Sequence, residues 1–154
     1  MAQLSIEMEL RPFRPSDLQT LYEIDQACFP PEISYSLSEL EAFVTHPGSM
    51  TWTAEDGGEI TGFLVAQSEA DRIGHIITID VVEAWRRRGV GRALMDAAER
   101  WATEQHLRMI YLETAEDNLA AQRFYKKYGY AKVEKLEEYY PHGGAAWIMV
   151  KWMK

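Results

Sequence analysis

The sequence is poor in cysteine, lacks a long apolar run and carries fewer basic than acidic side chains. Its single cysteine, Cys28, excludes an intramolecular disulfide and favours a reducing, cytoplasmic setting. No uninterrupted apolar stretch reaches the roughly 18 residues of a membrane span, so we expect no membrane-spanning segment. The 16 Lys and Arg against 24 Asp and Glu give a net charge of −8. Nonspecific nucleic-acid binding needs an extended basic face, so this charge argues against a nucleic-acid partner.

Histidine is also scarce, and its spacing does not suggest a metal site. The four histidines, His46, His75, His106 and His142, show no metal-ligand spacing, so we predict no bound metal. His75 lies in or beside an apolar strand, where a histidine is more often a core residue than a ligand. The chain has 154 residues, 47% of them hydrophobic. We therefore expect a single globular domain over residues 1–154.

Apolar periodicity and turn residues predict the element order β-α-α-β-β-β-α-β-α-β-β. This order favours an α/β fold in which a mixed sheet of about seven strands has helices on both faces. The predicted strands are 7–13, 50–55, 60–67, a buried strand from Ile76, 109–114, and a closing hairpin of 130–140 and 145–152. The predicted helices are one opened by a capping box at Ser16, one opened by a second capping box at Ser36, one from Val90 and one opened by Asn118.

A turn with three arginines and two glycines joins the buried strand to the helix from Val90. A helix start carries partial positive charge, so each arginine there costs about 0.3–1 kcal/mol unless an anion sits nearby. Gly89 and Gly91 remove the Cβ atoms that would keep a bulky anion from the backbone amides. The turn therefore predicts a phosphate or pyrophosphate site. The alternative is a solvated basic turn whose glycines only satisfy the backbone. The pattern matches neither the P-loop nor the dinucleotide fingerprint.

The run Arg86-x-x-Gly89-x-Gly91 resembles the acetyl-CoA motif [RQ]xxGx[GA] of the GNAT acetyltransferases. The resemblance covers essentially the whole chain, and it implies a V-shaped opening between the two central strands that receives acetyl-CoA. It also implies that the turn amides bind the CoA pyrophosphate and that the strand before the turn lies against the pantetheine and the acetyl group. The residues implied to bind the cofactor are Ile79, Val81, Val82, Arg86, Arg87, Arg88, Gly89, Val90, Gly91, Arg92, Asn118 and Tyr125.

A second GNAT signature, NxxAxxxYxxxGF, is similar to the run from Asn118 to Tyr130, in which Tyr125 matches the tyrosine. In the family this tyrosine approaches the CoA sulfur, which implies a general acid. A phenol with a pKa of about 10 is protonated at pH 7 and can donate to a thiolate whose pKa is about 8.5. Periodicity alone leaves open that Tyr125 is only a packing residue of an amphipathic helix.

Leu112-Glu113-Thr114 resembles the LEV segment of the bacterial ribosomal-protein alanine N-acetyltransferases (RimI-type), whose glutamate is the proposed general base. The resemblance assigns that role to Glu113, and the alternative is a solvent-facing carboxylate at a strand end. The tetrahedral oxyanion also needs a donor. We expect a main-chain amide near Val81 or Val82 to supply it.

The acceptor side of the site rests on two aromatic segments. Phe29, with Tyr35 downstream, resembles the FP…WS segment of the RimI-type enzymes, and Tyr139-Tyr140 resembles their YYP. The resemblance implies that Phe29, Tyr35, Tyr139 and Tyr140 bind a peptide N-terminus. The alternative for the tyrosine pair is plain cross-strand packing. The chain also departs from the subgroup, because residues 143–146 lack the two carboxylates that usually follow this turn.

Together these resemblances imply a GNAT-fold, acetyl-CoA-dependent N-acetyltransferase. Acetyl transfer would be direct, because Cys28, the lone thiol, is expected to lie far from the motifs in the fold. The preferred acceptor is a protein N-terminal α-amine, with Glu113 as general base and Tyr125 as general acid. The alternatives are a small-molecule amine or a protein lysine as acceptor, or a CoA-binding module without turnover. A monomer and a homodimer are both compatible with the sequence.

Overall fold

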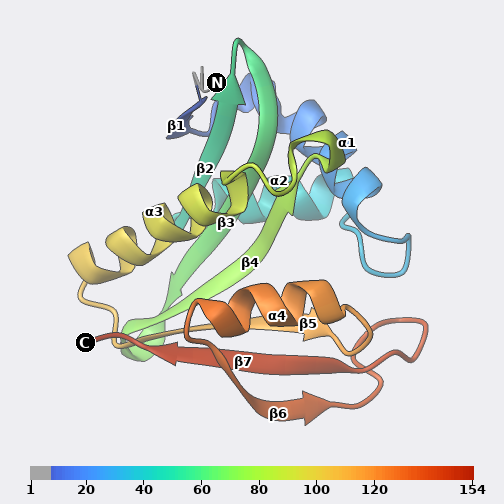
Figure 1. Cartoon of the computed structure of the whole chain (residues 1–154), viewed down its shortest axis with the longest axis vertical. Coiled ribbons are helices and arrows are strands. Elements are labelled where there is room, and N and C mark those ends of the chain that lie inside the picture. Colours follow the sequence, from blue (N-terminus) through green and yellow to red (C-terminus); the bar gives the residue numbers. More distant parts are fainter. Residues whose placement is uncertain (1–7) are drawn as a thin grey trace.

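The computed structural model describes residues 8–154, which form one seven-stranded mixed sheet flanked by helices (Figure 1). The strand order is β1-β2-β3-β4-β5-β7-β6. The strands are β1 (Met8–Pro12), β2 (Ser49–Asp56), β3 (Glu59–Glu69), β4 (Ile73–Val81), β5 (Met109–Ala115), β6 (Ala131–Leu136) and β7 (Ala146–Trp152). The helices are α1 (Leu18–Cys28), α2 (Leu37–Thr45), α3 (Val90–Glu104) and α4 (Leu119–Lys127), with short 3₁₀ turns η1 (Pro15–Asp17), η2 (Ala70–Arg72) and η3 (Glu83–Trp85). The predicted fold class and element order are confirmed.

The helices cover both faces of the sheet, and each pair buries its own apolar cluster. Leu21 and Ile24 of α1 and Leu40 of α2 pack against β3 on one face. The long helix α3 and the shorter α4 contribute Leu94 and Tyr125 to the larger cluster on the other face. In Figure 1, α3 and α4 lie in front of the sheet, and α1 and α2 lie behind it. This layering follows from the apolar stripe that each helix presents every three to four residues.

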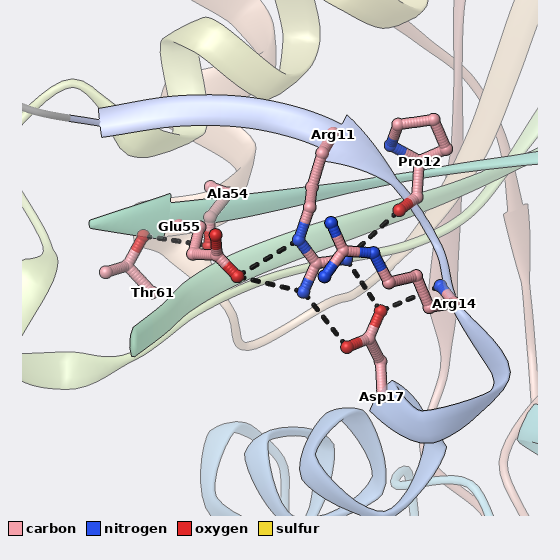
Figure 2. Close-up of polar contacts among 7 residues, drawn as sticks. All are labelled: Arg11, Pro12, Arg14, Asp17, Ala54, Glu55 and Thr61. Atoms are coloured by element: carbon pink, nitrogen blue, oxygen red, sulfur yellow. Dashed lines mark hydrogen bonds and ion pairs between the residues drawn. The ribbon is translucent and has the colours of Figure 1, made fainter. Parts of the chain in front are cut away.

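The expected capping box at Ser16 is wrong, because α1 starts at Leu18 after the 3₁₀ turn η1. The anchoring side chain is Asp17, whose Oδ2 accepts the Arg14 amide at 2.8 Å (Figure 2). Arg11 donates to both Asp17 oxygens, at 2.8 and 3.0 Å, and its Nε donates to Glu55 at 3.0 Å. The Arg11 guanidinium holds the pKa of Asp17 below its usual value. The local cap therefore uses Asp17 and the Arg14 amide in place of Ser16, and an ion pair with β1 holds Asp17 in position.

The second capping box is confirmed at the start of α2. The Ser36 hydroxyl accepts the Glu39 amide at 3.1 Å, and the Glu39 carboxylate accepts the Ser36 amide at 2.8 Å. Two of the orphan donors at this helix start are therefore satisfied by local side chains.

Two strand ends differ from the expected ones by three or more residues, and a third expected end cannot be compared. The first strand was expected to begin at Glu7, which lies outside the described residues. The buried central strand begins at Ile73 rather than Ile76. In the closing hairpin β6 ends at Leu136, so Tyr139 and Tyr140 lie in the loop before β7 and not in a strand. The expected hairpin pairing is present, and β7 also pairs with β5.

The central strands β4 and β5 are parallel neighbours that separate. They pair only where Ile73, Gly74 and His75 face residues 109–111. Just beyond this point β4 has a β-bulge against β3 that leaves Ile77 without a paired residue. A bulge bends its strand and increases the local twist. The carboxyl ends of β4 and β5 therefore diverge, which confirms the expected V-shaped opening (Figure 1).

Candidate active site

A cavity of about 1200 Å³ fills the opening between β4 and β5. Its walls come from these strands, the turn before α3, the start of α4, the loop between α1 and α2, and the loop between β6 and β7. It brings together most of the residues predicted for the site: Phe29, Tyr35, Ile79, Val81, Arg86, Arg87, Gly89, Gly91, Arg92, Glu113, Asn118, Tyr125, Tyr139 and Tyr140.

Three of the residues predicted to bind the cofactor are not among those that line the cavity. The Arg88 guanidinium lies over the Trp85 ring, 4.9 Å from its centroid. Val90 is buried in the core beneath α3. Val82 donates its amide to the Thr61 carbonyl at 2.9 Å. Any contact of Arg88 or Val90 with a ligand would therefore come from the backbone of the turn.

The turn before α3 has the geometry of an anion site. Gly89 is the residue that precedes the helix, and its φ of +88° is in the left-handed region. Arg87 is also left-handed, with φ +65°, a conformation that costs an arginine about 1–2 kcal/mol. A Cβ on Gly89 would meet no atom within 4 Å, and no side chain caps the helix start. The first amides of α3 are thus free to meet a ligand at the positive end of the helix dipole.

The end of β4 offers one of the two expected oxyanion donors. The Val82 amide is already used by β3. Successive residues of a strand direct their backbone groups to opposite edges, so the Val81 amide points into the opening that β5 has left. The Val81 carbonyl points the same way, since it accepts Arg86 Nε at 3.1 Å and the Cys28 thiol at 3.5 Å.

Cys28 is therefore closer to the site than we expected. Its sulfur lines the cavity and lies 3.6 Å from Arg86 Nη2. The expectation that it lies far from the motifs is wrong, because α1 crosses the end of β4. Burial, followed by the charge of Asp80, raises the pKa of the thiol to about 11. At neutral pH it is thus a protonated thiol and a poor nucleophile.

Tyr125 projects from α4 into the same cavity and is only 8% exposed. Burial, with a smaller contribution from the charge of Asp80, raises the pKa of its phenol above the usual value. The hydroxyl is therefore protonated at neutral pH and can donate a proton or a hydrogen bond. The helix is held in place at its start, where Asn118 Oδ1 accepts the Ala121 amide at 3.1 Å.

A second tie fixes α4 to the end of β5. The side-chain amide of Gln122 donates to the carbonyls of Ala115 and Glu116, at 2.9 and 3.0 Å. Because β5 carries Glu113, this tie keeps the two predicted catalytic side chains on one rigid unit.

Glu113 lines the cavity from β5 and is hydrogen-bonded rather than free in solvent. Its Oε1 lies 2.8 Å from Nε2 of His75, and its side chain is 17% exposed. His75 was predicted to be a core histidine, and it is in fact part of this polar network. The parallel register places His75 opposite Tyr111, two residues before Glu113. Only knowledge of that strand pairing could have brought His75 and Glu113 together from the sequence.

The aromatic residues on the acceptor side meet at the cavity from distant segments. The Tyr35 amide donates to Asp25 Oδ2 at 2.8 Å, and its hydroxyl donates to the Ile77 carbonyl at 3.4 Å. The rings of Tyr139 and Tyr140 are in edge contact, with centroids 4.9 Å apart. Burial raises the pKa of Tyr140 to about 12. Because Tyr139 and Tyr140 lie in a loop, cross-strand packing does not explain them.

Within residues 8–154 no group of three His, Cys, Asp or Glu side chains is arranged to hold a metal ion. No helix in this part of the chain is long and apolar enough to cross a membrane.

Comparison with known proteins assigns the family. The model of the acetyltransferase (GNAT) family matches residues 18–130, from the start of α1 through α4. The chain belongs to the GNAT family of acetyltransferases. It is an N-acetyltransferase, and the predicted resemblance to GNAT proteins is confirmed. The matched segment contains the arginine–glycine turn, Glu113 and Tyr125, and the loop with Tyr139 and Tyr140 lies beyond it.

Several relatives of this GNAT protein carry more specific names. An N-alpha-acetyltransferase of Sulfurisphaera tokodaii is 29% identical over 160 residues, which covers 93% of this chain and 92% of the relative. The crystal structure of Ard1 from Thermoplasma volcanium is 32% identical, with a TM-score of 0.87 over 97% of this chain and 99% of that one. Arabidopsis thaliana NAA60 in complex with acetyl-CoA is 25% identical, with a TM-score of 0.82 and coverage of 95% and 98%.

The ribosomal-protein-S18-alanine N-acetyltransferase of Escherichia coli has a TM-score of 0.86 and 21% identity, covering 96% of this chain and 94% of that one. At this identity the likeness concerns the fold. The resemblance to RimI-type enzymes is thus a resemblance of architecture. That this chain acts on a protein N-terminal α-amine stays a prediction.

Proposed function

We propose that this chain transfers the acetyl group of acetyl-CoA directly to the α-amine of a protein or peptide N-terminus. The observation that carries the proposal is that one cavity joins the anion-binding turn, Tyr125 and Glu113. Relatives that span most of the chain are named N-alpha-acetyltransferases, which supports an N-terminal acceptor.

The cofactor side of the cavity suits acetyl-CoA. The free amides at the start of α3, with Arg87 and Arg92 beside them, would bind the pyrophosphate. The β4 edge near Ile79 and Val81 would lie along the pantetheine, because this edge has no strand partner where β5 has diverged. The complex of the related NAA60 with acetyl-CoA supports the same co-substrate here.

The side chains present can carry each proton of a direct transfer. The amine nitrogen attacks the thioester carbonyl and loses its proton to Glu113. The Val81 amide donates to the oxyanion of the tetrahedral intermediate. The carbon–sulfur bond then breaks, and Tyr125 donates its proton to the leaving thiolate. No covalent acetyl-enzyme is needed, in keeping with the protonated state of Cys28.

An N-terminal α-amine suits both Glu113 as the base and the acceptor wall, which we define as the aromatic side chains that line the cavity beside Glu113. An α-amine has a pKa of about 7.7–8, against about 10.4 for lysine, so a carboxylate base suffices for it. Tyr35, Tyr139 and Tyr140 offer hydroxyls and ring faces to an extended peptide backbone. Flat aromatic walls with polar edges are common where a protein holds a polar chain.

The proposal is tested by measuring thiol release from acetyl-CoA with three acceptors. These are a short peptide with a free α-amine, the same peptide blocked at that amine but carrying a lysine, and a polyamine. We expect turnover with the first peptide alone. Turnover confined to the polyamine or to the blocked peptide would refute the N-terminal acceptor, and cofactor binding without turnover would favour a non-catalytic module.

A pair of glutamate variants tests the base. Glu113→Gln should lower kcat by about 10²–10⁴-fold without weakening acetyl-CoA binding. Glu116→Gln is the matched control, because Glu116 also lines the cavity but is paired with Lys135 at 3.0 Å. Equal activity of the two variants would remove Glu113 from the mechanism.

A further inference from the structure

We infer that Asp25 and Asp80 are positioning residues, which share one buried proton and thereby hold Tyr35 of the acceptor wall in place. The inference rests on the proposed role of Tyr35 in binding the acceptor. Asp25 lies on α1, and Asp80 lies on β4 directly before Val81. Neither aspartate is among the residues that line the cavity, so the pair would act without touching a substrate.

The two aspartate side chains meet between α1 and the sheet. In the register of β3 and β4, Asp80 is opposite Phe63, which belongs to the apolar cluster beneath α1 and α2. Asp25 is 0% exposed and Asp80 is 1% exposed. Burying a carboxyl group among apolar side chains is costly unless its oxygens find hydrogen-bond partners. The partners of the four oxygens therefore indicate what the pair does.

Two of the four carboxyl oxygens accept hydrogen bonds from neighbouring groups. Asp25 Oδ2 accepts the Tyr35 amide at 2.8 Å. Asp80 Oδ1 accepts the hydroxyl of Thr78, which lies two residues earlier on the same face of β4. Within residues 8–154, Asp25 Oδ1 and Asp80 Oδ2 are buried and have no other partner. The two side chains are within hydrogen-bond reach of each other, so one proton shared between these two oxygens satisfies both.

The surroundings of the pair favour keeping that proton. Two carboxyl groups that share a buried site do not both ionise, because their like charges would repel at low dielectric. Burial, followed by the hydrogen bond and the charge of Asp25, raises the pKa of Asp80 well above its usual value. Arg86 opposes this shift, but it is exposed and its Nε is bonded to the β4 backbone. The Cys28 thiol and the Tyr125 phenol, which also lie near Asp80, are neutral at pH 7.

Tyr35 is held through its backbone by α1 and through its hydroxyl by β4. Its amide donates to Asp25, and its carbonyl accepts the side-chain amide of Gln26 at 2.7 Å. Its hydroxyl donates to the Ile77 carbonyl at 3.4 Å, and its ring is in edge contact with Phe43, with centroids 5.1 Å apart. Gln26 is exposed, whereas Asp25 is buried. Asp25 is therefore the better shielded of the two backbone ties.

The pair links the acceptor loop to the place where the thioester would react. The loop between α1 and α2 contributes Tyr35 and several of its neighbours to the cavity. Asp80 is directly followed by Val81, whose amide we propose as the oxyanion donor. The shared proton therefore fixes the acceptor wall relative to the reacting carbonyl. Losing it should weaken peptide binding and leave the affinity for acetyl-CoA unchanged, because the arginine–glycine turn is not part of this link.

The first test follows hydrogen exchange of the Tyr35 amide by NMR and needs no turnover. Asp80→Leu leaves the Asp25 carboxylate facing an apolar group, so it should turn toward water and release the Tyr35 amide. This amide should then exchange about 10- to 100-fold faster, the effect of losing one hydrogen bond to a charged group. Asp80→Asn keeps a donor for Asp25 and should retain native exchange. The Glu39 amide, bonded to the Ser36 hydroxyl at 3.1 Å, is the internal control. Equal acceleration of both amides, or native exchange of Tyr35 in Asp80→Leu, would overturn the inference.

The second test is steady-state kinetics with a peptide that has a free α-amine. Asp80→Leu should raise KM for the peptide about tenfold, the effect of misplacing one aromatic contact, and Asp80→Asn should restore it. In an Asp25→Leu background, Asp80→Leu should have no further effect on this KM, because Asp80 acts through Asp25. Asp17→Ala removes another buried carboxylate, which is bonded to Arg11 and does not line the cavity, and is the control for lost stability. An equal rise in KM in Asp17→Ala, or additive effects of the two leucine substitutions, would overturn the inference.

The third test detects the proton itself and holds even if Asp80→Leu does not fold. Infrared difference spectra at pH 7 should show the carbonyl band of one protonated carboxyl group in the native protein that Asp80→Asn lacks. Absence of this band from the native protein would overturn the inference. If the band is present and the Tyr35 amide responds as expected but no peptide is acetylated, the proposed function has failed and the link from Asp80 to Tyr35 stands.

Discussion

The two walls of the cavity are built in different ways. The wall that we propose for the cofactor is centred on one contiguous segment, residues 86–92 at the turn and start of α3, which presents mainly backbone amides shaped by Gly89. The acceptor wall collects side chains from three segments far apart in the chain, the α1–α2 loop, β5 and the β6–β7 loop. A backbone site needs only a local conformation, whereas a side-chain site needs the whole fold.

The largest effect is expected where the two walls meet, at Tyr125. Tyr125→Phe removes the proposed proton donor and should lower kcat by about 10²–10⁴-fold, with little change in the affinity for acetyl-CoA. Steady-state kinetics and a binding titration measure the two effects. Tyr128→Phe is the matched control, because Tyr128 directly follows α4 and its hydroxyl is bonded to Asp96 at 2.8 Å. A fully active Tyr125→Phe would return Tyr125 to a packing role.

Among substitutions in the cofactor wall, Gly89→Glu should weaken acetyl-CoA binding most. The new carboxylate would lie where we propose that the pyrophosphate binds, so acetyl-CoA affinity should fall by at least about 100-fold, which corresponds to losing about two charge-assisted hydrogen bonds. Gly58→Glu is the control with the same backbone, since its φ of +86° is close to the +88° of Gly89 and its Cβ also meets open space. Both variants should lose similar stability by thermal melting, and retained binding in Gly89→Glu would contradict the assignment of the turn.

Substitutions in the acceptor wall should instead weaken the binding of the peptide. Tyr139→Ala removes a ring that is packed against Tyr140 and should raise KM for the peptide about tenfold, since an aromatic pair contributes about 0.5–1.5 kcal/mol. Acetyl-CoA affinity should stay native. Trp152→Ala removes an exposed ring that is not among the residues lining the cavity and serves as the control. An unchanged peptide KM in Tyr139→Ala would show that this loop does not hold the acceptor.

The smallest effect concerns a buried carboxyl group that is not among the residues lining the cavity, Asp80. Asp80 on β4 is buried against Asp25 on α1, and burial followed by Asp25 raises the pKa of Asp80 well above its usual value. The native state therefore keeps a proton that the unfolded chain has lost. Stability should fall as the pH rises above about 4, the unfolded pKa, and through the native pKa.

Asp80→Asn removes this titration while keeping a hydrogen-bond donor for Asp25. The variant should lose less stability than the native protein between pH 5 and pH 8, by a few degrees in Tm at about 2–4 °C per kcal/mol. Thermal melting at the two pH values measures the difference, with Asp56→Asn at the end of β2 as control. Equal pH dependence of the native protein and Asp80→Asn would contradict the raised pKa of Asp80.

The same contrast explains what could be predicted from the sequence. The element order, the Ser36 capping box and the place of the arginine–glycine turn between β4 and α3 depend on residues a few positions apart, and all were predicted correctly. The start of α1 was missed because Asp17, and not Ser16, caps the preceding 3₁₀ turn at the Arg14 amide, and Asp17 is held there by Arg11 from β1. The partnership of His75 with Glu113 was missed because it depends on the register between β4 and β5.

The position of Cys28 was missed for a related reason. Its place in the cavity depends on how α1 crosses the end of β4, and the sequence near Cys28 carries no signal of that crossing. Residues that meet through strand register or helix crossing leave no local pattern. The acceptor is accordingly the least predictable part of the function.

The most direct test of the account uses one peptide that carries both a free α-amine and a lysine. After limited turnover with acetyl-CoA, mass spectrometry of the fragments locates the acetyl group. We expect the acetyl group on the α-amine, with the lysine unmodified. Acetylation of the lysine in preference to the α-amine would contradict the assignment of the acceptor wall.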